Sequence, residues 1–411
     1  MSIESIRKES ELLDIFCSLA EIPSPSLHEE KVIEWIKNYC NKNDIFCSLD
    51  NYKNVYIYIP PTDETKQSIM FSAHMDVVGD ASPVKLLLDG DFIKADGRTL
   101  GADDKVGVAS ALYLAKEVKN DPSLKHGGLE ITFTRDEETN MSGIEHVDFS
   151  KIKSKYVLVC DADKLAQVQI SGASYTNAKI YVKGLIGGHS GIDIGDKTRL
   201  NAAKLIAELL NDFPQGVYYQ DETGVITSCN LGAIVAGGIQ NAVRSMVDEK
   251  YISTDYIKDI NKKSSTNIIN TDARASYSIR SASIEKETEL KDIMKSCVDN
   301  FNKKYDGLAV AEIEFEVHLP PFEKADDDSI PELHTKVCDM LGIKNEVSSF
   351  HAGAETHIYA HQKNSKGETF MPFLLGLADV YNMHSANEKV DYKTLLKGYS
   401  IIKELFIEFN K

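Results

Sequence analysis

The stretch IMFSAHMD, residues 69–76, is an apolar run that ends in two side chains able to bind a metal ion. Ile69–Ala73 has the continuous apolar character of a strand that is buried on both faces of a sheet. His74 and Asp76 follow at once, and their spacing of two places both side chains on the same side of the strand end. A carboxylate beside an imidazole orients the ring and raises its basicity, as in many metal sites. The pair alone also fits a helix N-cap or a surface ion pair, so the choice between these roles and a metal site depends on the neighbouring segments.

Similar strands recur along the chain with helices between them. Leu129–Thr134 (LEITFT) and Tyr156–Cys160 (YVLVC) are again short apolar runs. Ser26, with Glu29 three residues later, predicts the N-cap of a helix over residues 28–40. Strands that alternate with helices at this spacing predict an α/β fold built on a largely parallel sheet.

Acidic and histidine side chains follow these strands, or precede a helix, in four further places. Asp103 and Asp104 open the helix predicted for Val106–Val118, where the helix dipole favours acids in any case. The other members of this set lie after the two strands named above and before the last helix: Asp136, Glu137, Glu138, Asp161, Asp163, His384 and Glu388. Ligand sites in open α/β sheets lie at the carboxyl ends of the strands, so we expect these side chains to converge. Two histidines and at least three carboxylates make the ligand set of a dinuclear hydrolytic site.

The sequence pattern changes near residue 175 and changes back near residue 320. Asn177–Val182 alternates between polar and apolar residues, as a strand with one solvent-facing side does. Two amphipathic helices are predicted, at 198–211 and 283–303. This pattern predicts one discontinuous domain and one inserted α+β domain, namely 1–176 with 320–411, and 177–319.

Two other histidine motifs have milder interpretations. His357 and His361 have the i, i+4 spacing of a zinc-binding helix, but the Glu that should follow the first histidine is absent. Gly187–Gly191 (GGHSG) resembles a phosphate loop, but it lacks a Walker Lys and a GxGxxG pattern. Glycines on both sides of His189 fit better with an imidazole presented to a substrate.

Composition limits the class of protein. The chain has 411 residues, and 63 Asp plus Glu against 46 Lys plus Arg leave a formal charge of −17. This acidity is spread along the chain, which disfavours nucleic acids and anionic membranes as partners. No apolar run approaches the roughly 20 residues of a membrane span, and the first ten residues lack the apolar stretch of a signal peptide. Seven scattered cysteines without a CxxC motif are typical of reduced thiols, so we expect a cytoplasmic location.

Together these motifs resemble those of the co-catalytic zinc exopeptidases, the family of peptidase T, aminoacyl-histidine dipeptidase and carnosinase. The resemblance is carried by HMD, DGRTLGADDK, DEE and GGHSG, whose order and spacing match over nearly the whole chain, at 74–76, 96–105, 136–138 and 187–191. DGRTLGADDK and the chain length are closest to peptidase T, whereas GLEITFTRDEET and GGHSG are closer to aminoacyl-histidine dipeptidase. The resemblance implies a phosphorylase/hydrolase-like α/β catalytic domain with an inserted ferredoxin-like lid, which is often also the dimerisation domain.

The resemblance also implies a metal site in this chain. Two zinc ions are expected, with Co²⁺ or Mn²⁺ as substitutes, and the implied ligands are His74, Asp103 and Asp161 for one ion, and Asp103, Glu138 and His384 for the other. Asp76 would orient His74. Glu137 would act as the general base toward a water that bridges the two ions, and would later give the proton to the leaving amine.

The lid is implied to contribute substrate contacts. His189 would help to hold the tetrahedral oxyanion, in dimeric relatives at the active site of the partner subunit. Arg280 and Asn267 would bind the substrate's C-terminal carboxylate or backbone, and a surface ion pair is the alternative role for Arg280. Asn241 is the other candidate for the lid asparagine, and residues 239–266 are then an insertion.

These expectations favour an enzyme that acts on short peptides. Glu355 would attract a free α-ammonium group, which favours a tripeptide aminopeptidase or a dipeptidase over a carboxypeptidase. The alternatives are an Xaa-His dipeptidase and an N-acyl amino acid deacylase or carboxypeptidase of the same family. A metal-binding protein without catalysis is a different class, and Glu137 argues against it, because binding alone needs no free base.

Overall fold

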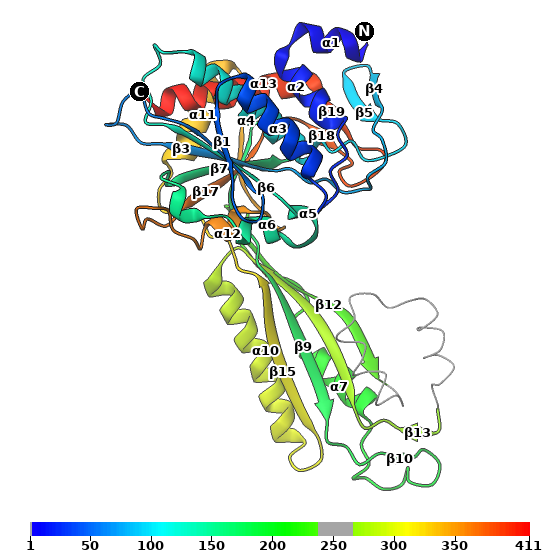
Figure 1. The fold of residues 1–411 in the computed structure, drawn as a ribbon. Helices are drawn as coiled ribbons and strands as arrows, with labels where there is room; N and C mark the ends of the chain where they lie inside the picture. The colour runs from blue at the N-terminus through cyan, green and yellow to red at the C-terminus, as the bar shows by residue number, and fades with distance from the viewer. Residues whose placement is uncertain (1, 237–265) are drawn as a thin grey trace. The chain divides into compact units, whose positions relative to one another are not determined.

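The computed structural model describes residues 2–236 and 266–411, which form two compact units (Figure 1). The first unit comprises Met1–Gly172 and Phe322–Lys411, and the second comprises Ala173–Pro321. The second unit thus begins at 173 where 177 was expected, and ends at 321 where 319 was expected. The roles of the units as catalytic domain and lid stay a prediction. None of the helices in the described ranges is long and apolar enough to cross a membrane.

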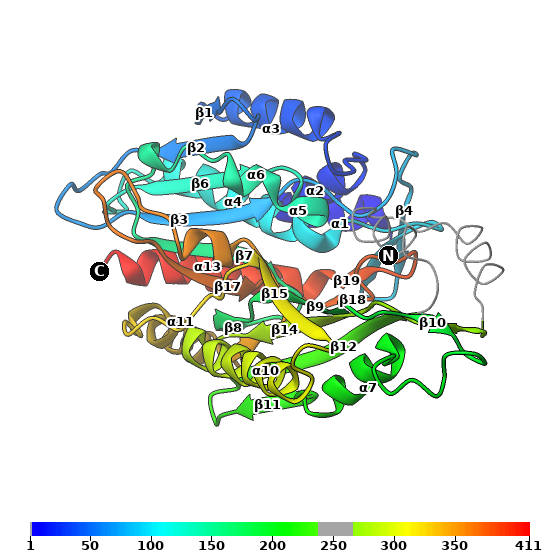
Figure 2. The same ribbon diagram turned by 90° about the horizontal axis from the view of Figure 1, so that it is seen from below.

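A mixed eight-stranded sheet forms the centre of the first unit (Figure 2). The strand order is β1-β2-β6-β3-β7-β17-β8-β16. The four central strands from β6 to β17 run parallel, whereas β1 and β2 extend the sheet in the antiparallel sense. In this order the strands span Phe46–Leu49, Val55–Ile59, Leu129–Thr134, Ile69–His74, Tyr156–Ala162, Met371–Gly376, Gln167–Gly172 and Glu346–Phe350.

Both faces of the central strands are buried, which accounts for their continuous apolar sequences. In β3, Ile69, Phe71 and Ala73 belong to one hydrophobic core, while Met70 belongs to a second core on the opposite face. The helices that pack into the first core are α1, α2, α3, α4, α11 and α13, at Ile3–Glu9, Glu11–Ala20, Glu30–Lys42, Ala102–Asn120, Ser329–Leu341 and Tyr392–Phe409. Short segments pack into the second core, among them α6, η1 and α12, at Ser142–Glu145, Phe149–Lys151 and Thr356–Tyr359.

A second, smaller sheet in this unit joins two distant parts of the chain. Its order is β18-β19-β5-β4, so the C-terminal segment pairs with a hairpin from near residue 90. The strands span Val380–Tyr381, Lys389–Asp391, Phe92–Ala95 and Leu86–Asp89. This pairing holds the residues between β18 and β19, including His384, beside the segment that leads into α4.

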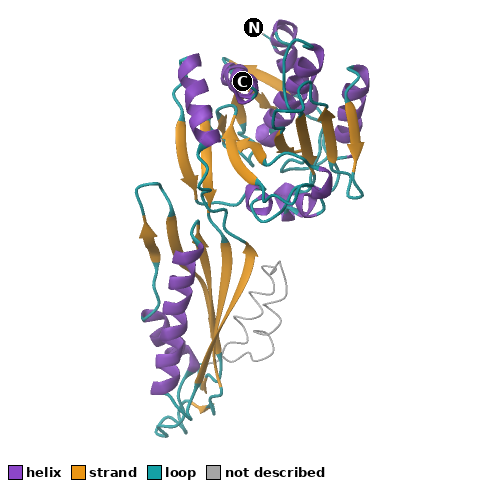
Figure 3. Ribbon diagram, turned by 90° about the vertical axis from the view of Figure 1, so that its left-hand side faces the viewer, coloured by secondary structure: helices purple, strands orange, loops and turns teal. Residues whose placement is uncertain are grey.

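In the described part of the second unit, an antiparallel sheet packs with two helices (Figure 3). Inward residues of its alternating strands share one core with both helices, as the period-two pattern predicts. The strand order is β11-β12-β14-β9-β15, at Gly216–Gln220, Ile226–Ala236, Ala273–Ser281, Tyr175–Lys183 and Val310–Leu319, and the helices are α7, Ala202–Asn211, and α10, Ile284–Lys304. The α/β class is confirmed, and the inserted unit has the expected α+β composition.

The predicted helix cap at Ser26 is wrong. Helix α3 begins at Glu30, and its N-terminus has no side-chain cap. The Ser26 hydroxyl instead donates a hydrogen bond to Oδ2 of Asp76 at 2.7 Å. The Glu29 carboxylate likewise pairs with a distant residue, Arg135. The capping-box spacing therefore reflects contacts to residues far away in the sequence, which a local pattern does not reveal.

Candidate active site

Asp103 lies between two imidazole rings in the first unit. Its Oδ1 is 3.0 Å from Nε2 of His74, and its Oδ2 is 3.0 Å from Nε2 of His384. His74 ends the buried strand β3, Asp103 lies in the first turn of α4, and His384 lies between β18 and β19. Three segments that are far apart in sequence thus bring one carboxylate into contact with both predicted histidine ligands.

Two more carboxylates extend this arrangement. Oε2 of Glu138 is 3.1 Å from Nε2 of His384, and Oδ1 of Asp161 is 3.5 Å from Nε2 of His74. Nε2 of each histidine therefore faces Asp103 and a second acid. The five predicted ligands share one cluster, and their role as ligands stays a prediction.

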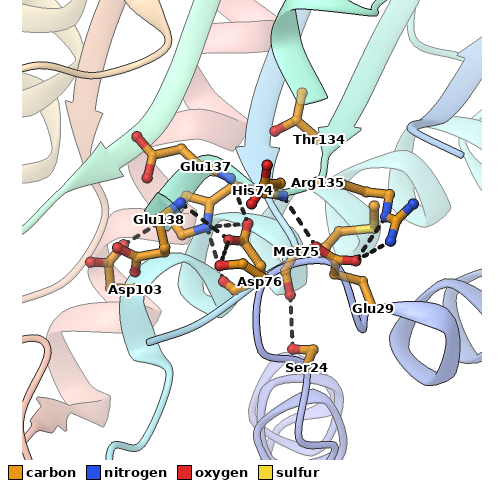
Figure 4. Close-up of polar contacts among 12 residues, drawn as sticks. Ser24, Glu29, His74, Met75, Asp76, Asp103, Thr134, Arg135, Glu137 and Glu138 are labelled. Carbon is orange, nitrogen blue, oxygen red and sulfur yellow. Dashed lines mark hydrogen bonds and ion pairs between the residues drawn. The ribbon is translucent and has the colours of Figure 1, made fainter. Parts of the chain in front are cut away.

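Asp76 ties the end of β3 to the acidic turn that follows β6 (Figure 4). Its two carboxylate oxygens accept hydrogen bonds from the backbone N–H groups of Glu137 and Glu138, at 3.0 and 3.1 Å. The backbone carbonyl oxygen of Asp76 is 3.0 Å from Nδ1 of His74, closer than its carboxylate at 3.4 Å. Asp76 thus orients the histidine through its carbonyl oxygen and holds both glutamates through its side chain.

A buried ion pair supports the same turn from another side (Figure 4). The Arg135 guanidinium donates to Oε2 of Glu29 through Nε at 2.7 Å and Nη2 at 2.6 Å. Oε1 of Glu29 accepts from the backbone N–H of Asp136 at 3.1 Å, and Asp136 has a left-handed φ of 53°. The sequence did not indicate this pair, since Glu29 and Arg135 are 106 positions apart.

The cluster carries an excess of buried negative charge. Burial raises the pKa of Asp161 to about 8 and that of Glu138 to about 7, and neighbouring carboxylates add to both effects. The hydrogen bond between His384 and Asp103 raises the pKa of His384 to about 9. Burial would lower the pKa of His74, but its hydrogen bonds to the carboxylates of Asp103 and Asp161 outweigh this effect and raise the pKa well above the ordinary value. The cluster therefore favours bound cations or protons.

The residues present fit a pair of divalent cations. Among the described residues, no Lys or Arg forms an ion pair with Asp103, Glu138 or Asp161, so only the two imidazoles oppose their charge. Oε1 of Glu138 and Oδ2 of Asp104 are buried and have no hydrogen-bond partner in the described chain. Carboxylate oxygens and imidazole nitrogens are ordinary ligands of zinc and of other divalent ions. Two donor groups close enough to share an ion are His74 with Asp103 and Glu138, and His74 with Asp104 and Asp161.

For Asp104 the sequence suggested only the role of an acid at a helix N-terminus. Its side chain is buried, and Oδ1 accepts a hydrogen bond from the backbone N–H of Gly107 at 3.0 Å, as a helix cap does. Asp103, the preceding residue, has non-helical backbone angles and points its carboxylate to the histidines. Of the two adjacent acids, one therefore caps the helix and the other enters the cluster. In the sequence, its adjacency to Asp103 was the only sign that Asp104 would lie near the cluster.

Glu137 and Glu355 lie close to the cluster without joining its short contacts. Burial raises the pKa of Glu137 well above its ordinary value, and the charge of Glu355 contributes to this shift. Glu355 is only 1% exposed, and its Oε2 lies 3.5 Å from the Ser72 hydroxyl of β3. The predicted ammonium-binding acid is thus an interior carboxyl group, and its contact with a substrate stays a prediction.

In the second unit, His189 is presented by a loop that its own backbone stabilises. Nδ1 of His189 accepts hydrogen bonds from the backbone N–H groups of Gly191 at 3.1 Å and Ile192 at 3.2 Å. The proton of the neutral ring therefore lies on Nε2, which is left as a donor on an exposed side chain. Asp193 fixes the same turn, since its Oδ2 accepts the His189 backbone N–H at 2.7 Å.

The other lid residues lie at two different ends of the second unit. The backbone oxygen of Asn267 accepts from the N–H of Ser190 at 2.9 Å, so Asn267 lies beside the His189 loop. Arg280 is at the opposite end of β14, where its guanidinium lies 4.8 Å from the ring centre of Tyr175. Six strand residues separate these ends, or about 20 Å. Asn241, the other candidate, falls outside the described residues, as does most of the predicted insertion at 239–266.

The second histidine motif stays apart from the cluster. His357 is fully buried beside the rings of Phe322 and Phe350. Its Nδ1 is 2.9 Å from the backbone oxygen of Ala354. This environment is that of a core histidine.

The match to known families agrees with this geometry. The family model described as "Peptidase family M20/M25/M40" matches residues 70–408, which include both histidines of the cluster and all of its acids. The chain belongs to this family. The membership predicted from the motifs is thus confirmed, and so is the enzyme class, a hydrolase that acts on peptide bonds.

Individual known proteins are similar to the chain over different lengths. Protein YqjE of Bacillus subtilis strain 168 is 24% identical over 412 residues, which cover 98% of this chain and 99% of that protein. The cytosol non-specific dipeptidase of Escherichia coli K12 is 29% identical over 229 residues, 48% of this chain and 46% of the dipeptidase. The crystal structure of aminopeptidase PepT from Bacillus cereus ATCC 10987 has the same fold, with a TM-score of 0.79 at 21% identity, covering 97% of this chain and 98% of PepT.

Proposed function

We propose that this M20-family chain is a metal-dependent exopeptidase that removes residues from short peptides, as a tripeptide aminopeptidase. The observation that carries the proposal is the position of Asp103, whose two oxygens face His74 and His384 at 3.0 Å each. One carboxylate between two imidazoles, each with a second acid beside it, has the donor arrangement for two neighbouring cations. Similarity to an aminopeptidase supports the choice of substrate end.

The cluster divides into two ligand groups that share Asp103. One zinc ion would be held by His74, Asp103 and Asp161, and the other by Asp103, Glu138 and His384, with Co²⁺ or Mn²⁺ as substitutes. When bound, two such ions lower the pKa of a water and polarise the scissile carbonyl group. Asp104, buried with a free oxygen, is a further candidate donor.

Glu137 is the group that moves the proton. Its backbone N–H is held by Asp76, and its neighbour Glu138 faces His384, so the Glu137 carboxylate is adjacent to the ligands but not among them. In this role its carboxylate takes a proton from the attacking water and returns it to the amine of the departing residue. Burial favours the protonated form of the side chain, which suits the second half of that cycle.

Residues of the lid and of the α12 segment bind and orient the peptide in this proposal. Nε2–H of His189 donates to the carbonyl oxygen as negative charge develops on it. Arg280 and Asn267 bind the C-terminal carboxylate or the backbone, and Glu355 balances the α-ammonium group. Because Asn267 lies beside His189 and about 20 Å from Arg280 in one chain, His189 and Asn267 would come from the second chain of a homodimer. No carboxylate forms an ion pair with Arg280 among the described residues, which leaves its guanidinium available for an anion.

The two parts of the chain have different roles in this proposal. We assign catalysis to residues 1–176 and 320–411, and the lid and dimerisation roles to 177–319. The chain would work as a homodimer in the cytoplasm on small peptides. Its charge of −17 is spread along the chain and disfavours nucleic acids and anionic membranes as partners.

The substrate is decided by a panel measured with added Zn²⁺, Co²⁺ or Mn²⁺. Tripeptides, Xaa-His dipeptides and N-acetyl amino acids are compared, each with free and blocked ends where these exist. We expect tripeptides with a free N-terminus to be cleaved fastest. Preference for Xaa-His dipeptides, or for N-acyl substrates, would establish one of the alternatives instead.

The mechanism is tested by two substitutions in the cluster. Glu137→Ala is expected to keep both metal ions and lose about 10²–10⁴-fold in kcat, the range of general-base contributions. Asp103→Ala is expected to lose metal, because it removes the donor shared by both groups. Metal content by atomic absorption separates the two effects. An active Glu137→Ala enzyme, or an Asp103→Ala protein with two ions, would refute these assignments.

A further inference from the structure

One buried carboxylate, that of Glu388, accepts hydrogen bonds from four consecutive backbone N–H groups. Its Oε2 accepts from Leu100 at 2.9 Å and from Gly101 at 3.0 Å. Its Oε1 accepts from Ala102 at 2.8 Å and from Asp103 at 3.3 Å. Glu388 is 1% exposed, and no Lys or Arg forms an ion pair with it in the described ranges. Backbone dipoles at the start of α4 therefore hold this charge.

The loop that Glu388 binds has little freedom to take another shape. Gly101 has a left-handed φ of 75°, and a Cβ atom there would lie 2.6 Å from Cγ1 of Val77. The loop thus packs against the segment after His74 on one side and against Glu388 on the other. Its last residue is Asp103, the carboxylate that faces both histidines.

Glu388 also belongs to the segment that carries His384. Its own backbone N–H donates to the carbonyl oxygen of Ser385 at 3.1 Å, and β19 begins at the next residue. The His384 side chain is 52% exposed, so few contacts other than those to Asp103 and Glu138 restrain it. One side chain thus connects the segment of His384 to the segment of Asp103.

We infer that Glu388 is a positioning residue that fixes Asp103 and His384 at their mutual distance and thereby sets the affinity of the shared metal site. The inference rests on the proposed function for the metal, but the clamp on residues 100–103 is independent of it. Without the carboxylate, four N–H groups at a buried turn lose their acceptors, and the backbone of Asp103 is free to move. Loss of such supporting groups weakens metal binding 10–100-fold in metalloenzymes generally.

The test compares Glu388→Gln with Glu130→Gln in the full-length, metal-free protein. Glu130 is also fully buried and also accepts backbone N–H groups, those of Lys153 and Ser154, but it lies away from the cluster. Amide hydrogen exchange of a peptide covering 100–103 reports the clamp, and calorimetric titration with Co²⁺ reports the site. A thermal melt of each variant reports general destabilisation.

We expect Glu388→Gln to raise exchange at 100–103 and to weaken the affinity for Co²⁺ by 10–100-fold. Glu130→Gln is expected to lower the melting temperature while leaving both readouts as in the wild type. If the glutamine variant does not fold, Glu388→Asp, which keeps the charge, replaces it. This variant should show smaller changes in exchange and in Co²⁺ affinity in the same directions. Unchanged exchange at 100–103, or wild-type Co²⁺ affinity despite raised exchange, would overturn the inference. A wild-type protein that binds no Co²⁺ would refute the proposed function, while the exchange result would still decide whether the clamp exists.

Discussion

The acidic cluster of the first unit and the His189 loop of the second hold their candidate functional side chains in place in different ways. In the cluster, buried carboxylates on distant segments accept the backbone N–H groups of two ligand-bearing turns, as Asp76, Glu29 and Glu388 do. In the loop, the side chain is exposed, and its conformation depends on a contact to Asp193, on glycines and on backbone pairing with residues 267–269. One site is held by buried side chains and the other by backbone contacts of an exposed turn.

This difference determines what a substitution should cost. Removing a buried carboxylate leaves charges and N–H groups without partners, so the stability of the whole unit suffers. Removing a contact of an exposed loop leaves groups that water can satisfy, so stability changes little while the imidazole loses its orientation. The comparison fails if substitutions in the two regions affect stability and activity alike.

The largest expected effect on stability comes from Arg135→Met. This change leaves Glu29 buried and unpaired, which should lower the free energy of unfolding by about 3–5 kcal/mol. Urea denaturation followed by the fluorescence of Trp35, the single tryptophan, reports on the first unit. Asp96→Asn is the control, because its ion pair with Lys85 is exposed and should contribute less than about 1 kcal/mol. Equal losses of unfolding free energy for both variants would show that the buried pair contributes no more to stability than the exposed pair.

The largest expected effect on activity without an effect on stability comes from His189→Ala. Loss of a donor to the developing oxyanion should lower kcat by about 10²–10³-fold. The Trp35 transition in urea should stay within about 0.5 kcal/mol of the wild type, since the side chain is exposed. His189→Asn tests the role of the ring, because it can keep an acceptor near the position of Nδ1 but has no donor at the reach of Nε2. A wild-type kcat in either variant would remove His189 from the mechanism.

The same contrast explains which features the sequence could predict. The cluster was predictable because each member directly follows a buried strand or precedes a helix, and parallel strands bring such positions to one edge. The role of Glu388 was not, because its four partners are backbone groups that lie some 285 positions away and have no sequence signature. Similarly, Ser26 and Glu29 looked like a local helix cap until the fold placed Asp76 and Arg135 beside them.

The separation of Arg280 from His189 was also beyond the sequence. Both were expected to contact one short substrate, but strand register places them at opposite ends of β14 and its neighbours. Register depends on which residues of two strands pair, and alternating patterns fit several alignments equally well.

An intermediate effect is expected from Gly188→Ala in the His189 loop. Gly188 has a φ of 147°, and a Cβ there would lie 2.8 Å from Oδ2 of Asp193, the atom that holds the His189 backbone. Strain of about 1–3 kcal/mol should displace the turn and lower kcat about tenfold or more. Gly195→Ala is a matched control on the same loop, because no atom lies within 4 Å of its added Cβ and its φ is not positive. Peptide hydrolysis assays on both variants check this, and equal kcat values would show that the shape of the turn is unimportant.

The smallest effect is expected from Asp193→Asn, which changes charge but keeps an acceptor. Asparagine can still accept the backbone N–H of His189, so only the charge-assisted part of that bond and the attraction to Arg199 are lost. We expect a loss of about threefold to tenfold in kcat, equivalent to about 1 kcal/mol, with the Trp35 transition unchanged. Asp193→Ala removes the acceptor as well and should cost more, which separates the hydrogen bond from the charge. If the asparagine variant instead destabilised the first unit, the contrast between the buried cluster and the exposed loop would fail, because a change confined to an exposed turn has no buried partner through which to act.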